Sequence, residues 1–93
     1  MNIFSNLYNS FDEFYDTFLR GNEIEFIYKN TKYSILPLYN NEIANEVIGV
    51  EVCEFESDNV IRCLSRLELY NAIINGDPFH EILCNIEITW NNI

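Results

Sequence analysis

Residues 21–35 read GNEIEFIYKNTKYSI, and this stretch decides the fold. From Ile24 to Tyr28, large apolar side chains occupy every second position, which is the period of a β-strand. A second run of this kind follows at residues 32–36, after a short polar stretch. The two runs predict a β-hairpin with its turn near Asn30. Pro37 is expected to end regular pairing or to lie at a sheet edge, because proline has no backbone N–H to donate.

The segment before Gly21 has the period of a helix instead. Apolar residues recur at three- and four-residue steps from Ile3 to Leu19 and form one broad apolar face. Gly21 supplies the left-handed position that commonly ends a helix. Ser10, followed by acidic residues, marks a second candidate start. The helix is therefore predicted to begin near residue 3 or near residue 10.

A third strand is predicted from Val47 to Glu56, with Val50 and Val52 on one face. The residues 57–59, Ser-Asp-Asn, are typical of a turn. Two structures fit what comes next. One is a second hairpin, and the other is a helix that begins within this turn and runs through Leu67.

The pairing expected across this turn favours the hairpin, with Val60–Leu64 as its returning strand. If the turn has three residues, Cys53 lies opposite Cys63 and Glu54 lies opposite Arg62. A cysteine pair in this position would be reduced by default and would form a disulfide only under oxidation.

Helix signals return after this hairpin. Ser65 and Glu68 have the spacing of a capping box, which predicts a helix over residues 66–74. Asn75-Gly76 is expected to end it. Asp77-Pro78 then has the residue types of the N-cap and first position of a last helix.

The sequence therefore predicts one α+β domain over residues 1–93. Its parts are an N-terminal helix, an antiparallel sheet of four strands (three under the helix alternative), two C-terminal helices and a frayed end at residues 89–93.

The charge of the chain is its most unusual property. Fifteen acidic residues oppose five basic ones, for a formal net charge of -10. This charge repels nucleic-acid phosphates and anionic membranes, so we expect no direct nucleic-acid or membrane binding. It favours the basic surface of a protein or ribonucleoprotein.

Other features of the sequence indicate a cytoplasmic protein, located in the host cytoplasm if a phage encodes it. The N-terminus lacks the basic and apolar regions of a signal peptide. No run approaches the roughly 18 apolar residues of a membrane span. Three cysteines without a CxxC spacing argue against a secreted disulfide framework.

Residues with the pattern of an active site are nearly absent from the sequence. The only histidine, His80, precedes Cys84 by four residues, which would place both on one helix face as a dyad or half of a metal site. Zinc needs three or four ligands. Carboxylate pairs such as Glu23 and Glu25 are interpreted as a solvated strand face, and the three glycines are isolated rather than grouped in a phosphate-binding loop. We therefore expect no catalytic residues, no metal, no cofactor and no enzyme activity.

The candidate partner-binding residues are acidic and fall in two segments. The helix strip is Asp12, Glu13 and Asp16, and the hairpin cluster is Glu51, Glu54, Glu56 and Asp58. Either segment has a spacing of negative charge that would suit a basic groove made for nucleic acid. Six tyrosines add side chains that protein interfaces favour.

Two stretches carry a resemblance to known proteins. They are GNEIEFIYKNTKYSI at residues 21–35 and SRLELYNAIINGDPFHEIL at residues 65–83. In these the chain resembles small uncharacterised acidic proteins of low-GC bacteria and their phages. In size, acidity and element order it is also similar to phage anti-CRISPR inhibitors that mimic nucleic acid.

The resemblance implies an inhibitor of a basic nucleic-acid-handling partner, such as an anti-CRISPR or other anti-defence protein. Two alternatives stay open. One is an immunity protein or antitoxin that masks a bacterial toxin, and the other is a structural or regulatory domain that self-associates. We expect a monomer or a weak homo-oligomer.

Overall fold

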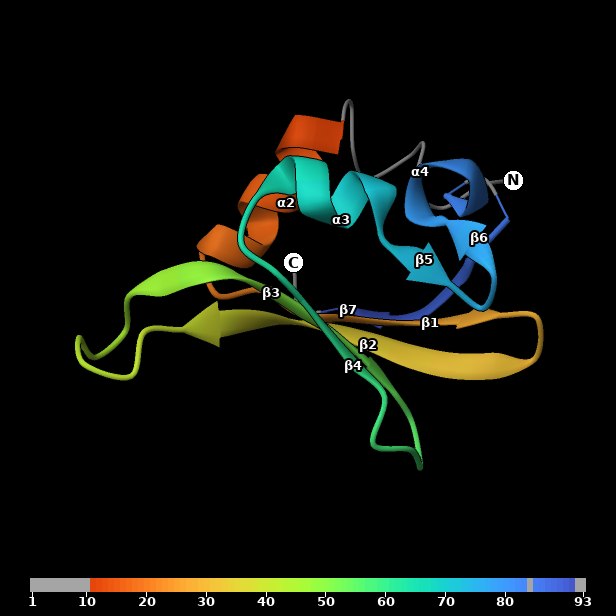
Figure 1. The fold of residues 1–93 in the computed structure, drawn as a ribbon, viewed down its shortest axis with the longest axis horizontal. Helices are drawn as coiled ribbons and strands as arrows, with labels where there is room; N and C mark the ends of the chain where they lie inside the picture. The colour runs from red at the N-terminus through yellow and green to blue at the C-terminus, as the bar shows by residue number, and fades with distance from the viewer. Residues whose placement is uncertain (1–10, 84, 92–93) are drawn as a thin grey trace.

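The computed structural model describes residues 11–83 and 85–91. Its two layers are an antiparallel sheet of five strands and a set of helices on one face of that sheet (Figure 1). In chain order the elements are helix α2 (Phe11–Leu19), strands β1 (Ile24–Tyr28), β2 (Thr31–Tyr39), β3 (Val47–Glu54) and β4 (Val60–Cys63), helix α3 (Arg66–Asn71), strands β5 (Ile73–Ile74) and β6 (Asp77–Pro78), helix α4 (Phe79–Ile82) and strand β7 (Glu87–Asn91). The large sheet has the order β4-β3-β2-β1-β7, and β5 and β6 form a small separate hairpin.

Helix α2 packs its apolar face on the sheet, as its period predicts. Phe14 and Phe18 of this helix are fully buried. The helix ends before Gly21, whose φ of 92° is the left-handed conformation expected there. The earlier start predicted near residue 3 lies outside the described residues.

The hairpin predicted at residues 21–35 is confirmed. Tyr28 pairs with Thr31, so the turn consists of Lys29 and Asn30 alone. Both turn residues have positive φ, 51° and 62°, as a type I′ turn requires. Ile24, on the face toward the helices, pairs with Ile35.

Pro37 does not end the pairing of β2. The strand continues to Tyr39 and pairs with β3 along this stretch, Pro37 itself with Val50. The expectation of an edge is nevertheless met locally, because the pairing of β1 with β2 stops at Ile35. Beyond that point β2 has a strand partner on one side only among the described residues.

The second hairpin is confirmed and the helix alternative is wrong. Its predicted register is also wrong, because Cys53 pairs with Val60, three residues before the predicted partner Cys63. The loop between the strands, Phe55–Asn59, has five residues rather than three. Glu56 has a φ of 60° within this loop, and the Glu54 N–H bonds to the Asn59 carbonyl at 3.1 Å. The longer loop shifts the pairing so that Val52 lies opposite Ile61, both on the side of the core.

The C-terminal third differs most from the prediction. The N-cap predicted at Ser65 is confirmed, since its Oγ accepts the Glu68 N–H at 3.2 Å. The Glu68 carboxylate contacts the Ser65 hydroxyl at 3.4 Å, which is a variant of the predicted capping box. However, helix α3 ends at Asn71 rather than at residue 74. Asn75-Gly76, predicted to end that helix, instead forms the turn of the β5–β6 hairpin.

The predicted last helix and frayed end are also corrected. Asp77-Pro78 forms strand β6, and the helix after it, α4, is four residues long. The residues expected to fray include Thr89–Asn91, which belong to β7 and pair with β1. The sheet therefore has five strands instead of four, because β7 adds a strand beside β1.

The core lies between the sheet and the helical layer. Its fully buried large side chains are Phe14, Phe18, Phe26, Phe79, Ile24, Ile35, Leu69, Ile74, Ile82, Val50 and Val52. Four of them are phenylalanines, and Phe79 contacts the rings of both Phe14 and Phe26. The opposite face of the sheet, which we call the uncovered face, has none of the described helices against it (Figure 1).

Candidate partner-binding surfaces

The helix strip lies on the polar side of α2, as predicted. Asp12 and Glu13 are exposed and Asp16 is half-buried, because the apolar residues between them face the core. Asp12 Oδ1 forms an ion pair with Arg66 Nη1 of α3 at 3.0 Å. Hydrogen bonding to Asp12 raises the pKa of Arg66. Part of the predicted strip therefore joins the two helices.

The hairpin cluster is spread over three surfaces. Glu51 lies on the uncovered face, because its neighbours Val50 and Val52 point into the core. Glu54 lies on the side of the helical layer, opposite Tyr33. The four carboxylates are close in sequence, but strand alternation separates them in space.

The remaining two carboxylates of the cluster, Glu56 and Asp58, are exposed in the β3–β4 loop. Figure 1 shows this loop projecting from the sheet at the opposite end of the view from α2. The helix strip and the hairpin cluster therefore do not form one continuous surface.

The uncovered face carries two ion pairs across strands. Lys32 Nζ lies 3.2 Å from Glu25 Oε1, and Arg62 Nε lies 3.8 Å from Glu51 Oε2. Glu54 was predicted to lie opposite Arg62, but Glu51 takes that place. These contacts neutralise the basic residues of this face.

The predicted cysteine pair does not form. Cys53 pairs with Val60 and points to the uncovered face, whereas Cys63 pairs with Val50 and lies in the core. Their side chains therefore point to opposite faces, and no disulfide between them is compatible with this register. Burial, with Glu68 adding to it, raises the pKa of Cys63 to about 11, so its thiol is protonated and weakly nucleophilic at neutral pH.

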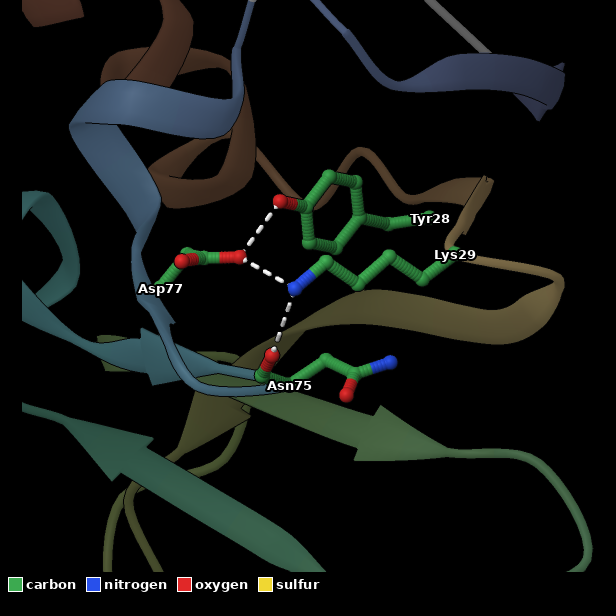
Figure 2. A network of polar contacts seen from close by, with 4 residues as sticks. All are labelled: Tyr28, Lys29, Asn75 and Asp77. Carbon is green, nitrogen blue, oxygen red and sulfur yellow. Dashed lines mark hydrogen bonds and ion pairs between the residues drawn. The ribbon is translucent and has the colours of Figure 1, made fainter.

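The tip of the β1–β2 hairpin is held by a polar network (Figure 2). Asp77 Oδ2 accepts a hydrogen bond from the Tyr28 hydroxyl at 2.6 Å and contacts Lys29 Nζ at 2.7 Å. The same ammonium donates to the Asn75 carbonyl at 3.4 Å. Lys29, and then Tyr28, lower the pKa of Asp77 by hydrogen bonding to it.

This network has the geometry of a structural clamp. Hydrogen bonding to Asp77 raises the pKa of both Lys29 and Tyr28. A general base needs the reverse shift, a pKa lowered toward neutrality. All three side chains therefore keep their ordinary charge states and tie the β1–β2 turn to the β5–β6 hairpin.

A cleft opens between the β3–β4 hairpin and the β5–β6 hairpin. Its volume is about 260 Å³, and it is lined by Tyr33, Val52, Glu54, Asn59, Val60, Ile61, Ile73, Ile74 and Asn75. Glu54 Oε2 accepts a hydrogen bond from Asn59 Nδ2 at 3.2 Å. Burial raises the pKa of the Tyr33 phenol and the Glu54 carboxylate raises it further, while hydrogen bonding to Thr31 and Asn75 opposes the rise.

The sequence pointed to two residues of the cleft, Glu54 of the hairpin cluster and Tyr33 as one of the six tyrosines. Asn75 was missed because it was assigned to the end of a helix, and Asn59 because it was assigned only to a turn. Asn75-Gly76 after Ile73-Ile74 is also typical of a hairpin turn, and this interpretation would have predicted the β5–β6 hairpin that lines the cleft.

His80, the candidate for a dyad with Cys84, lies beside an aromatic ring. The imidazole of His80 stacks on the ring of Tyr70, with centroids 4.6 Å apart. Cys84, its proposed partner, lies outside the described residues. Among residues 11–83 and 85–91, no three His, Cys, Asp or Glu side chains are grouped to hold a metal ion. No helix in this part is long and apolar enough to cross a membrane.

A search for similar proteins gave no match to a protein-family model, to a curated protein or to a solved structure.

Proposed function

We propose that this protein binds a basic, nucleic-acid-handling partner and inhibits it by occupying a surface made for nucleic acid. The observation that carries the proposal is that most of the basic side chains form ion pairs with carboxylates of the same chain. Four of the five, Lys29, Lys32, Arg62 and Arg66, are held in ion pairs within the chain. These pairs use four of fifteen carboxylates, so the outward field is strongly negative.

Such a field attracts a basic groove and orients the encounter. The most concrete version is a phage anti-CRISPR or other anti-defence protein, in which the exposed β3–β4 loop enters a channel for a guide or target strand. The carboxylates of Glu56 and Asp58 on that loop, with Glu54 at its base, would occupy the positions of the nucleic-acid phosphates in the partner's channel. An immunity protein that masks a toxin would use the same electrostatics with a different partner.

The test begins with capture of basic proteins from a low-GC bacterial lysate at low salt, followed by purification of the captured protein. Its binding to its own nucleic acid is then measured with and without the acidic protein. We expect inhibition, and a complex at least about tenfold weaker at about 500 mM salt than at about 50 mM.

Two matched variants locate the contact. The loop variant E54Q/E56Q/D58N and the helix variant D12N/E13Q/D16N each remove three negative charges. We expect the loop variant to lose most of the affinity and the helix variant to keep most of it. A captured partner that is not inhibited, or a complex insensitive to salt, would show the proposal to be wrong.

The uncovered face favours a second function, self-association. Trp90, opposite Glu25, is 45% exposed, and Ile48, beside Glu51 and Arg62, is 41% exposed, although both are large and apolar. Light scattering after size exclusion tests this function directly. A concentration-dependent dimer that Trp90→Ser removes would support it, and a monomer at high concentration would exclude it.

A further inference from the structure

We infer that the cleft between the β3–β4 and β5–β6 hairpins is a binding site for one arginine side chain of the protein's partner. The inference rests on the proposed function for the source of that arginine. The site itself is argued from the residues that line the cleft.

The size of the cleft restricts what it takes. Its volume of about 260 Å³ is below the roughly 300–1,000 Å³ of sites for drug-sized ligands. One long side chain is a suitable occupant. Interfaces commonly place a single anchoring side chain, often arginine, in a pocket of this kind.

The lower part of the cleft is apolar. Val52 and Ile74 are almost fully buried, and Ile61 and Ile73 lie further out. These residues suit the methylene stem of a long side chain, which is stabilised by apolar contact while its charged end stays near polar groups.

The polar side chains of the cleft include one carboxylate, Glu54, beside the amide of Asn59. Asn59 donates through Nδ2 to Glu54, so its Oδ1 is left to accept. The Tyr33 phenol and the Asn75 amide lie in the same lining and hydrogen-bond to each other. A planar guanidinium has five N–H donors and pairs with carboxylates in two-point geometry, so it matches this set better than an ammonium does.

Lys29, whose charge acts on Tyr33 of the cleft, is neutralised by an ion pair. Lys29 Nζ reaches the Asn75 carbonyl, but Asp77 neutralises it at 2.7 Å. None of the ion pairs among residues 11–83 and 85–91 involves Glu54. The carboxylate of the cleft is thus available to a cation from outside.

The test uses the protein alone with a defined probe, N-acetyl-arginine amide. Its neutral isostere, N-acetyl-citrulline amide, is the first control, and the lysine analogue is the second. Binding is followed by NMR titration of the backbone amides. We expect saturable shifts at Ile61, Ile73 and Ile74, with the citrulline probe at least about threefold weaker and the lysine probe between them.

Two pairs of variants sharpen the test. E54Q and E56Q make the same chemical change two residues apart, but only Glu54 lines the cleft. E54Q should reduce the preference for arginine over citrulline to near one, and E56Q should keep it. I73R, which supplies the chain's own guanidinium, should abolish probe binding. I43R is its control, since Ile43 is 57% exposed and Ile73 is 56% exposed.

The outcomes separate this inference from the proposed function. No saturable shifts, equal affinity for both main probes, or equal effects of E54Q and E56Q would overturn it, even if the loop variant still weakened a partner. Glu54-dependent arginine binding would support it, even if no basic partner were found. A lysine probe that bound more tightly than arginine would also overturn it.

Discussion

The sheet contains two antiparallel hairpins, β1–β2 and β3–β4, whose tips differ: the tip of the first contacts the rest of the fold, and the tip of the second is exposed to solvent. The β1–β2 turn is two residues long and is clamped to the β5–β6 hairpin through Lys29 and Asp77. The β3–β4 loop is five residues long and exposes Glu56 and Asp58. The first hairpin uses its tip to hold the fold together. The second hairpin has no ion pair at its tip among the described residues, and Glu56 and Asp58 are exposed there.

The largest difference is expected in core residues of the two hairpins. Phe26 of β1 is fully buried against Tyr33 and Phe79, so Phe26→Ala should lower the free energy of unfolding by about 3–5 kcal/mol. Phe55 of the β3–β4 loop is 41% exposed, and Phe55→Ala should cost about 1 kcal/mol or less. Urea denaturation measures both. Equal losses would contradict the contrast between the hairpins.

A smaller effect tests the shifted register of the second hairpin. A Cβ on Gly49 would lie 2.2 Å from the Cys63 carbonyl oxygen, so Gly49→Ala should force β3 and β4 apart and cost about 1–3 kcal/mol. The control is Gly76→Ala, where a Cβ meets open space and only the φ of 87° is unfavourable. That variant should cost about 1 kcal/mol. A Gly49→Ala protein as stable as the natural one would show that the register is wrong.

The smallest effect concerns the clamp and depends on pH. The pKa of Asp77 lies below its ordinary 3.8, so its contribution to stability is present above 3.8 and is lost as the pH falls through the folded pKa. Asp77→Asn should therefore lower the thermal midpoint at neutral pH, and this deficit should shrink in acid. Asp58→Asn removes the same charge from the other hairpin's loop and should leave the midpoint unchanged. A deficit that stayed constant with pH would contradict the ionic role of Asp77.

Elements determined by residues close together in the sequence could be predicted, and elements determined by contacts between distant residues could not. The first hairpin could be predicted because alternation and a two-residue turn are local signals. Asn75-Gly76 was misassigned because the positive φ that ends a helix also makes a type I′ turn. Strand β7 was missed because its register with β1, Phe26 opposite Ile88, is set by contacts far apart in sequence.

The candidate site shows the same limit. Acidity and its position along the chain could be read from composition. Which carboxylate faces which surface depended on strand alternation and on the loop length, which placed Glu51 opposite Arg62 and Glu54 in the cleft. A shift of three residues in the pairing of β3 with β4 was enough to change both assignments.

The position of Pro37 has a consequence for how the protein behaves when concentrated. The Lys32 carbonyl accepts from Phe55 on the β3 side, so alternation turns the backbone nitrogens of the odd-numbered residues of β2 toward β1. Pro37 lies past the end of the pairing with β1, and its nitrogen has no hydrogen to offer there. A strand from a neighbouring molecule would find no N–H donor at that point, which weakens this edge as a template for the strand-to-strand pairing that leads to aggregation.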